Sequence, residues 1–409
     1  MRVIVTGGGA SGLLAAITAA GKGHEVIVLE QQDRIGKKLL STGNGRCNLS
    51  NTDLSLSHYH GLEDEAASRR FVQTVFSQVS PLDVLSFFQK LGLATTEKNG
   101  YLYPRSAQAS SVLDVLCMEL EHLKVRVVCD RTVTDLQVTD DGFLVRARED
   151  YPADRVILST GSLASVPKGC RDGSGLFRGT GHTIIDPVPA LTHLLTDHEH
   201  FRDLFGIRTQ GTVSVFDEGG NGIAKDTGEI QFSGTGISGI PAMQVCFHVS
   251  KLLLQGKRVL VRLDFLPEVK KDDLLPMLKE RREALGYRKA VSFLTGLLHP
   301  ELAAFLLREA DCGRDKNVSD LSDPELEKIR DLIKGMPFRI TGTGPKKDAQ
   351  VLAGGVKLSQ VSGTLESLVT KGLYVTGEAL DVNGDCGGYN LLFAFATGIL
   401  AGRLGTEHT

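Results

Sequence analysis

The first thirty residues of the chain alternate between short apolar runs and a glycine-rich turn. The apolar run 3–5 predicts a buried strand, and residues 7–12, which contain four glycines, follow it directly. Residues 13–20 have the composition of a helix, and a second apolar run, 26–29, ends on Glu30. This order of strand, tight turn, helix and strand predicts the first unit of a parallel, dinucleotide-binding α/β sheet.

Apolar spacing beyond residue 60 predicts further helices and strands in the first part of the chain. Two amphipathic helices and then a third precede a β-meander whose hairpin turn is Asp140-Asp141-Gly142. The next buried strand runs into Thr160 and Gly161, which taken alone would be an ordinary strand end. The predicted helices are 63–79, 81–91 and 107–123, and the predicted strands are 125–128, 132–138, 143–147 and 155–160.

The composition changes twice along the rest of the chain. Residues 191–266 are rich in predicted strands, and residues 267–337 are mostly helical and strongly charged. We predict that these two segments together form an inserted substrate or cap domain. Residues 1–190 and 338–409 would then be the first and second parts of one FAD-binding domain.

Three glycines of the first turn, Gly7, Gly9 and Gly12, have the G-x-G-x-x-G spacing of a dinucleotide fingerprint. Gly7 permits the tight turn, Gly9 lets the backbone approach a pyrophosphate, and Gly12 allows helix and strand to pack closely. Ser11 lies near the first helical turn, where free N–H groups and the helix dipole favour a bound diphosphate. Glu30 can accept hydrogen bonds from both hydroxyls of an adenosine ribose and would repel a 2′-phosphate, so FAD or NAD is favoured over NADP. The competing interpretation is a glycine-rich turn that binds no ligand.

A second glycine-rich segment, residues 36–48, follows the predicted ribose carboxylate and contains Lys37, Arg46 and Asn48. Three glycines and several cations cannot build a packed element, but their backbone amides can surround an anion or a flat ring. The alternative is a solvated surface loop.

Near the C-terminus, a buried strand ends at Gly377-Glu378, and two glycines precede a final helix at 391–404. The start of that helix can stabilise negative charge, for example on the pyrimidine side of a reduced flavin. Asp385 and Tyr389 are our candidates for a catalytic acid or an orienting group, because they lie where the last strand meets the last helix. The alternative interpretation is that Asp385 only caps the helix or binds ribitol hydroxyls and that Tyr389 only packs.

Composition narrows the classes of partner. The formal net charge is −3, with 46 basic and 49 acidic residues interspersed, so we expect no nucleic acid partner. No signal peptide or membrane span is predicted, which indicates a cytoplasmic protein. Seven cysteines without a C-x-x-C pair predict reduced thiols, and we expect no metal. Only one dinucleotide fingerprint is present, so NAD(P)H would reach the flavin without a Rossmann domain of its own, and the oligomeric state stays open.

The strings Gly45-Arg-Cys-Asn48 and Asp385-Cys-Gly-Gly-Tyr-Asn-Leu391 are specific, and with the fingerprint they give the chain a resemblance to one family over nearly its whole length. It resembles the FAD-dependent flavoproteins that include aminoacetone oxidase and 3-dehydro-bile-acid Δ4,6-reductase. The resemblance implies a split, glutathione-reductase-like Rossmann FAD domain with an inserted β-barrel-like and helical domain. The FAD contacts that it implies are Gly7, Gly9, Ser11, Gly12, Glu30, Lys37, Arg46, Asn48, Thr160, Gly161, Glu378, Asn390 and Leu391.

The chain departs from this family's pattern in two places. Many relatives have Phe-Thr-His-Tyr-Gly where this chain has Phe232-Ser-Gly-Thr-Gly236, so a histidine on the expected substrate side is absent. After Gly161 the family often has a second glycine and Ser-Tyr-Pro, whereas this chain continues Ser162-Leu-Ala-Ser-Val-Pro167. Both departures concern the substrate and leave the cofactor prediction intact.

Three functions compete. The first is an NAD(P)H-dependent reductase in which FAD passes hydride to the carbon–carbon double bond of an enone, steroid-like or bile-acid-like. Hydrophobic helices expected at 291–298 and 303–307 favour it by suiting a large apolar substrate, unless they only pack on each other. The second is a flavin amine oxidase acting on a small amine such as aminoacetone with oxygen as acceptor. The third is an FAD-binding RNA-modifying protein or a flavoprotein without catalysis.

Overall fold

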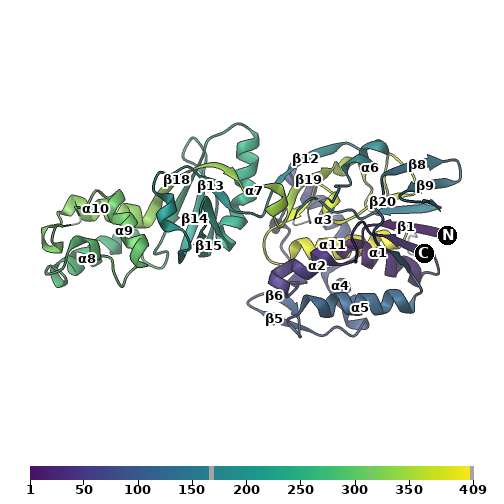
Figure 1. The fold of residues 1–409 in the computed structure, drawn as a ribbon, viewed down its shortest axis with the longest axis horizontal. Coiled ribbons are helices and arrows are strands. Elements are labelled where there is room, and N and C mark those ends of the chain that lie inside the picture. Colours follow the sequence, from purple (N-terminus) through teal and green to yellow (C-terminus); the bar gives the residue numbers. More distant parts are fainter. Residues whose placement is uncertain (165–169, 314, 406–409) are drawn as a thin grey trace. The chain divides into compact units, whose positions relative to one another are not determined.

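The computed structural model describes residues 1–164, 170–313 and 315–405, so Ser165-Val-Pro167 of the second family departure lie outside the described residues. The chain divides into two compact units. Unit 1 comprises residues 1–188 and 350–409, and unit 2 comprises residues 189–349 (Figure 1).

A five-stranded parallel sheet forms the centre of unit 1, with the strand order β20-β11-β1-β2-β7. Its middle strands are continuous apolar runs, since the sheet is covered on both faces and both side-chain orientations are buried. The predicted strand, turn, helix and strand are present. The strands are β1 (Arg2–Thr6), β2 (Glu25–Leu29), β7 (Arg126–Val128), β11 (Arg155–Leu158) and β20 (Leu373–Val375).

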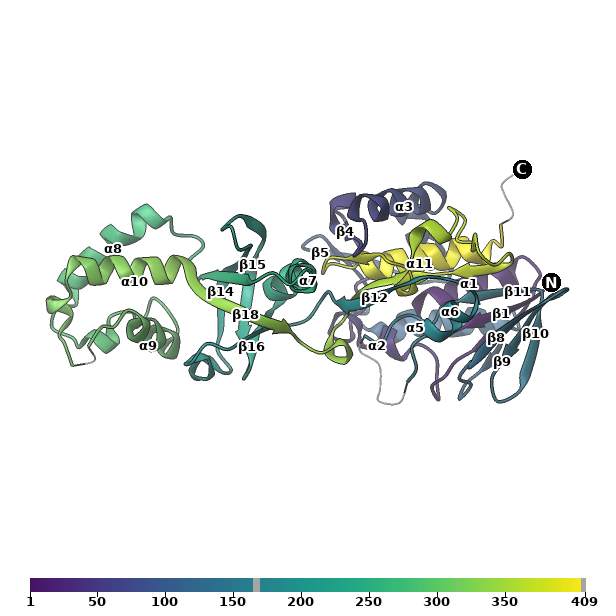
Figure 2. The same ribbon diagram turned by 90° about the horizontal axis from the view of Figure 1, so that it is seen from above.

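Two helices from opposite ends of the chain, α1 (Ala10–Gly21) and α11 (Tyr389–Gly402), lie against each other in this unit (Figure 2). Their backbones approach closely at two glycines of α11. A Cβ added at Gly398 would lie 2.3 Å from the carbonyl oxygen of Ser11, and one at Gly402 would lie 2.6 Å from that of Ala15. Larger residues at these positions would therefore push the two helices apart.

Local sequence signals set most of the other boundaries in unit 1. For example, α4 begins with a capping box, in which Ser80 Oγ accepts from Asp83 N (3.1 Å) and the Asp83 carboxylate accepts from Ser80 N (2.8 Å). The predicted meander forms an antiparallel sheet of β8, β9 and β10. The remaining helices are α2 (Lys37–Ser41), α3 (Glu65–Gln78), α4 (Pro81–Lys90), α5 (Ala109–His122) and α6 (Ser174–Gly179); the remaining strands are β3 (Ser50–Asn51), β4 (Tyr59–His60), β5 (Thr95–Lys98), β6 (Tyr101–Pro104), β8 (Asp135–Thr139), β9 (Gly142–Arg146), β10 (Asp150–Ala153), β12 (Ile184–Pro189), β19 (Leu352–Val356) and β21 (Asn383–Gly384).

Unit 2 contains a closed six-stranded barrel, with its own hydrophobic core. Residues 338–349, which we expected in the second part of the FAD-binding domain, belong to this unit. The reason is that β18 pairs with both β13 and β17 and so closes the barrel. The strands are β13 (Leu194–Thr196), β14 (Arg208–Phe216), β15 (Gly222–Phe232), β16 (Gly236–Gly239), β17 (Val259–Asp264) and β18 (Met336–Thr343); the helices are α7 (Ile240–Leu254), α8 (Lys271–Ala284), α9 (Pro300–Glu309) and α10 (Asp323–Gly335).

The prediction of a helix at 291–298 is wrong. The segment contains only the end of a short 3₁₀ turn, Ala290–Ser292, and Gly296 has a φ of +85°, which an α-helix cannot contain. Phe293 and Leu294 are fully buried in the core of unit 2, and five of the ten residues of α9 are buried there too. These apolar residues thus pack on one another, and they no longer support a large apolar substrate.

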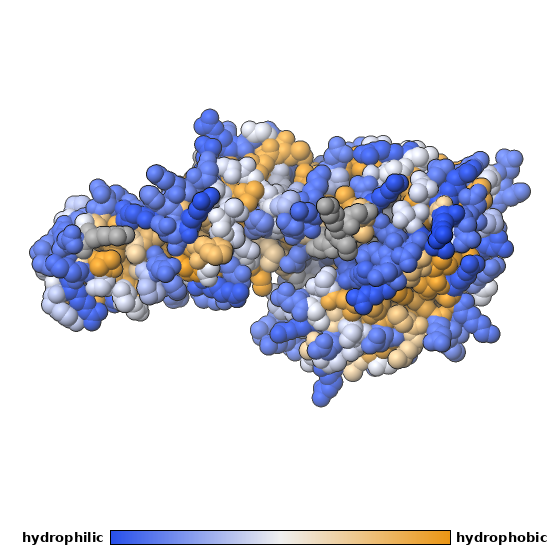
Figure 3. Space-filling model, viewed as in Figure 1, coloured by the Kyte–Doolittle hydropathy of each residue, from blue (hydrophilic) through white to orange (hydrophobic). Residues whose placement is uncertain are grey.

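Across the described residues, no helix is both long enough and apolar enough to cross a membrane. On the face in view, hydrophilic side chains predominate and hydrophobic ones form separate patches (Figure 3).

Candidate functional site

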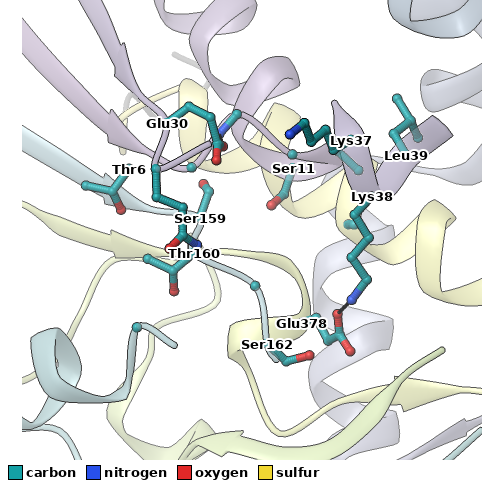
Figure 4. Close-up of a pocket in the computed structure, with 18 of the residues that line it drawn as sticks. Thr6, Ser11, Glu30, Lys37, Lys38, Leu39, Ser159, Thr160, Ser162 and Glu378 are labelled. Carbon is teal, nitrogen blue, oxygen red and sulfur yellow. Dashed lines mark hydrogen bonds and ion pairs between the residues drawn. The ribbon is translucent and has the colours of Figure 1, made fainter. Parts of the chain in front are cut away.

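A cavity in unit 1 lies where the parallel strands β1, β2 and β11 end, beside the starts of α1, α2 and α11. The carboxyl edge of such a sheet is where open α/β folds bind their ligands. Figure 4 shows the side chains that gather there. Of the predicted cofactor residues, those in its wall are Gly7, Gly9, Ser11, Glu30, Lys37, Thr160, Gly161, Glu378, Asn390 and Leu391.

The three fingerprint glycines differ in what surrounds them. Gly7 has a φ of +103°, and a Cβ there would lie 2.4 Å from the carbonyl oxygen of Ser159. A Cβ at Gly12 would lie 2.0 Å from the carbonyl oxygen of Gly7, so this glycine is needed for packing and lies outside the wall. At Gly9 a Cβ would meet no atom within 4 Å. Gly7 and Gly12 therefore shape the turn, and Gly9 leaves open space at the start of α1.

Glu30 is buried and anchors this turn. Its Oε2 accepts a hydrogen bond from Gly8 N (2.7 Å) and its Oε1 accepts one from Gln32 N (2.8 Å). Each carboxylate oxygen has capacity for another hydrogen bond, so Glu30 can still accept from the hydroxyls of a ribose. Glu30 thus has a structural role that the sequence did not reveal, besides the predicted binding role.

Three polar atoms in the wall have no hydrogen-bond partner within the described part of the chain. They are Thr6 Oγ1, Gln32 Oε1 and Thr160 Oγ1, and all three are buried. Buried polar groups without partners are rare in folded proteins and need an explanation. A polar ligand in the cavity would supply the missing partners. The residues present therefore fit a dinucleotide, with open space at Gly9, a carboxylate at the end of β2 and unsatisfied hydroxyl groups between them.

The cations of the glycine-rich segment are distributed differently from expectation. Lys38, which sequence reasoning did not select, lies in the wall and pairs with Glu378, whose Oε1 also accepts from Leu352 N at 3.0 Å (Figure 4). Lys37 pairs with Asp33. Arg46 is exposed and Asn48 is buried with its Oδ1 unpaired among the described residues, and neither contributes to the wall. Both lysines thus lie in the wall, each paired with a carboxylate, and the sequence contains no signal for the pairing of Lys38 with Glu378.

Asp385 and Tyr389 also lie outside the cavity wall, although their neighbours Asn390 and Leu391 are part of it. Asp385 instead accepts hydrogen bonds from two histidines that sequence reasoning missed. Its Oδ2 lies 2.9 Å from His58 Nδ1, and its Oδ1 lies 2.9 Å from His60 Nε2. The ring of Tyr389 stacks on His58 with centroids 4.4 Å apart.

Burial and these contacts shift the pKa values of Asp385, His58 and Tyr389. Burial alone would raise the pKa of Asp385, but its hydrogen bonds and charge interactions with His60 and His58 outweigh burial and leave the pKa lowered. Burial would lower the pKa of His58, but hydrogen bonds to Asp53 and Asp385 leave it raised. Burial raises the pKa of Tyr389 well above its usual range. Tyr389 is therefore a neutral phenol near neutral pH.

The cysteines offer no obvious reactive group. Burial raises the pKa of both Cys47 and Cys246 to about 12, so their thiolates are not accessible near neutral pH. All seven cysteines are free thiols. Over residues 1–164, 170–313 and 315–405, no cluster of His, Cys, Asp and Glu side chains is arranged to hold a metal ion.

The fold and the cavity together define a Rossmann-type dinucleotide-binding protein with an inserted barrel and helices. The chain belongs to the HI0933-like family, whose "HI0933-like protein Rossmann domain" profile matches residues 1–404. This confirms the family and the fold class predicted from the sequence.

Three named relatives are similar over nearly the whole chain. The 3-dehydro-bile acid delta(4,6)-reductase of Clostridium scindens is 42% identical, and the alignment covers 99% of each chain. The ribosomal RNA dihydrouridine synthase of Haemophilus influenzae is 25% identical over 96% of each chain. That of Escherichia coli is 24% identical over 96% of this chain and 95% of its own.

Proposed function

We propose that the protein is an FAD-dependent oxidoreductase that uses NAD(P)H to reduce a carbon–carbon double bond conjugated to a carbonyl group. The observation that carries this proposal is the cavity at the ends of β1, β2 and β11, with open space at Gly9, Glu30 in its wall and three buried polar atoms without partners. The 42% identity to a bile acid reductase supports the choice of reaction.

Each part of the cavity suits one part of the cofactor. The N–H groups at the start of α1, with no acidic side chain in its first turn, would bind the pyrophosphate next to Gly9. Glu30 would accept from the adenosine ribose. The start of α11, with Asn390 and Leu391 in the wall, would face the part of the flavin that becomes negative on reduction. When bound, FAD supplies the hydride chemistry that amino-acid side chains lack.

The names of the relatives agree on a reaction class. A Δ4,6-reductase adds hydrogen across carbon–carbon double bonds, and dihydrouridine differs from uridine by two hydrogens across a double bond that is conjugated to a carbonyl. Both reactions need hydride at the carbon remote from the carbonyl and a proton at its neighbour. We therefore favour enone-type reduction over amine oxidation. None of the described residues of the cavity wall favours amine oxidation.

The relatives differ in substrate, and the substrate class is the finer part of the proposal. We favour a small, steroid-like or bile-acid-like enone because identity to the bile acid reductase is 42% against 25% for an RNA-modifying relative. The interspersed charges and net charge of −3 also argue against an extended phosphate-binding face. Reduction of uridine in ribosomal RNA is the second candidate, favoured by the two synthases.

NAD(P)H is proposed as a transient donor rather than a resident ligand. The second glycine pair of the sequence, Gly342 and Gly344, flanks the end of β18 in the barrel and is followed by a 3₁₀ turn, Lys346–Asp348. This is not the strand–helix unit of a dinucleotide fingerprint. The nicotinamide would therefore have to reach the flavin directly.

An anaerobic stopped-flow experiment tests the proposal. The purified protein is mixed with NADH or NADPH, and the flavin absorbance is followed; bleaching followed by reoxidation with a 3-keto-Δ4 steroid or an unsaturated bile acid supports it. Reoxidation only by unmodified ribosomal RNA, with dihydrouridine measured by mass spectrometry, would select the second candidate. Bleaching by aminoacetone but by neither nucleotide would replace the reductase with the oxidase. A protein that takes up neither FAD nor FMN would refute the flavin itself.

A further inference from the structure

Carboxylates and imidazoles alternate in a chain beside the start of α11. Asp53 Oδ2 lies 3.0 Å from His58 Nε2, and His58 Nδ1 lies 2.9 Å from Asp385 Oδ2. Asp385 Oδ1 lies 2.9 Å from His60 Nε2, and His60 Nδ1 lies 3.2 Å from Glu65 Oε1. All four imidazole nitrogens therefore face carboxylate oxygens.

This geometry selects the protonated form of both histidines. An ionised carboxylate only accepts hydrogen bonds, and a neutral imidazole can donate from one nitrogen only. Each neutral ring would thus leave one nitrogen lone pair facing a carboxylate, whereas an imidazolium donates to both of its neighbours. The balance of charge agrees, because two imidazolium ions and Arg69, which lies 2.5 Å from Glu65, neutralise the three carboxylates.

The other titratable groups around this row of carboxylates and imidazoles are tyrosines and two further carboxylates. Tyr389 stacks on His58, and Tyr59 donates its hydroxyl to the carbonyl oxygen of Tyr389 at 3.2 Å. Tyr101 interacts electrostatically with Tyr389. The nearby carboxylates of Glu63 and Asp381 are bound to Lys357 and to backbone N–H groups, respectively. None of these neutralises the three carboxylates in place of the two histidines.

The chain of groups is connected to the cavity through Asp385. The backbone N of Asp385 donates to His58 O at 3.0 Å, and β21 pairs with β4 next to His60. Between Asp385 and α11, Gly387 and Gly388 have φ values of +142° and +94°, and Asn51 Nδ2 donates to the carbonyl oxygen of Gly387 at 3.0 Å. Asn390 binds both backbone groups of Gly384, at 2.8 and 2.7 Å, and lies in the cavity wall.

We propose that His58 and His60 are positioning residues that, as a pair of imidazolium ions, clamp Asp385 and hold the start of α11 in the cavity wall, and that loss of their protons releases it. The proposal rests on the proposed function only in taking the ligand of the cavity to be FAD. The raised pKa of His58 and the lowered pKa of Asp385 agree with an ion pair in the folded protein. None of the three groups lines the cavity, so they act through Asn390 rather than on a substrate.

The consequence is a cofactor site that weakens as pH rises. While both imidazoles are protonated the clamp is closed, and the start of α11 is fixed where the reduced flavin would carry its charge. Once the protons are lost, two negative charges on the cluster lose their partners, and the loop before α11 gains freedom. We expect the dissociation constant for FAD to rise about tenfold between about pH 6 and about pH 9.

The experiment uses the full chain with ¹³C,¹⁵N-labelled histidine and four variants: His60→Gln, His58→Gln, Asp385→Asn and, as a control, His122→Gln. His122 is exposed on α5. NMR of the imidazole nitrogens at about pH 6 should show His58 and His60 doubly protonated in the wild type. In Asp385→Asn, His58 should lose its proton at lower pH, because Asp385 is one of the groups that raise its pKa. FAD affinity should depend on pH in the wild type and in His122→Gln, and should be weaker and depend less on pH in His60→Gln.

Three results would overturn the proposal. The first is a neutral tautomer of both histidines at about pH 6. The second is an FAD affinity whose pH dependence is the same in wild type and Asp385→Asn. The third is unchanged hydrogen-exchange protection of the 385–391 amides, corrected for intrinsic rates, between about pH 6 and about pH 9 in the flavin-free protein. The first and third measurements need no cofactor. They therefore test whether the histidines clamp Asp385 even if the protein binds no flavin and the proposed function fails.

Discussion

Replacing Gly9 separates a binding role from a folding role more cleanly than any other substitution in the cavity. Gly9 precedes α1 with a φ of −92° and a ψ of −169°, values open to any residue, and a Cβ there would meet nothing within 4 Å. Gly9→Val should therefore fold, with a loss of at most about 1 kcal/mol for a poorer N-cap. Its side chain would occupy the space that a pyrophosphate needs.

The expected loss of binding follows from the hydrogen bonds that would be blocked. Hydrogen bonds from backbone N–H groups to a charged phosphate contribute about 1.5–3 kcal/mol each. Losing one or two of them should weaken FAD binding by about 3 kcal/mol, which is about 100-fold in the dissociation constant.

The assay is a titration of flavin-free protein with FAD, followed by fluorescence, with thermal unfolding of the same samples. Gly21→Ala is the matched control, because a Cβ at Gly21 also meets nothing and lies at the other end of α1. Gly12→Ala is the opposite case, since its Cβ would lie 2.0 Å from the carbonyl oxygen of Gly7 and should destabilise the fold. Unchanged FAD affinity in Gly9→Val would refute the assignment of the pyrophosphate site.

Three further predictions follow from contacts elsewhere in unit 1. Glu30→Ala should weaken FAD binding by roughly 1–3 kcal/mol. It should also destabilise the flavin-free protein, because Gly8 N and Gln32 N lose their acceptor. Glu30→Gln should recover part of that stability, as measured by urea unfolding. Asp381→Ala should lower the free energy of unfolding by about 3 kcal/mol, because three backbone N–H groups lose their acceptor, and Asp381→Asn should lower it less. The pKa of His58 is raised by folding, so its stabilisation is present below its ordinary pKa and is lost as pH rises through the raised one. The wild type should therefore be more stable than His58→Gln by about 0.5–1 kcal/mol near pH 6, allowing for solvent screening, and equal to it near pH 9; a difference that grows with pH would contradict the sign.

Local features were predictable because the sequence carries their cause within a few residues. The turn at Gly7 and Gly12 follows from steric limits on backbone and packing, and both limits are visible in the structure. Helix α4 follows from Ser80, Pro81 and Asp83. These signals need no knowledge of the rest of the chain.

The features that sequence reasoning missed depend on contacts between distant segments. His60 and Asp385 are 325 residues apart, and nothing near either residue indicates the other. The closing of the barrel by β18 depends on pairing with β13, which precedes it by more than a hundred residues. The pairing of Lys38 with Glu378 in the cavity wall joins residues that are 340 positions apart.

The packing of α1 against α11 also determines when the protein can acquire a ligand during its synthesis. The cavity wall combines residues near the start of the chain, such as Gly9 and Glu30, with residues 378–394, which emerge from the ribosome only after the whole of unit 2. Until α11 has been made, the apolar face of α1 that it covers stays exposed and the part of the wall formed by residues 378–394 is missing. Ligand uptake is therefore a late event in biogenesis, and a nascent chain stalled within unit 2 presents an unfinished first domain to chaperones and proteases.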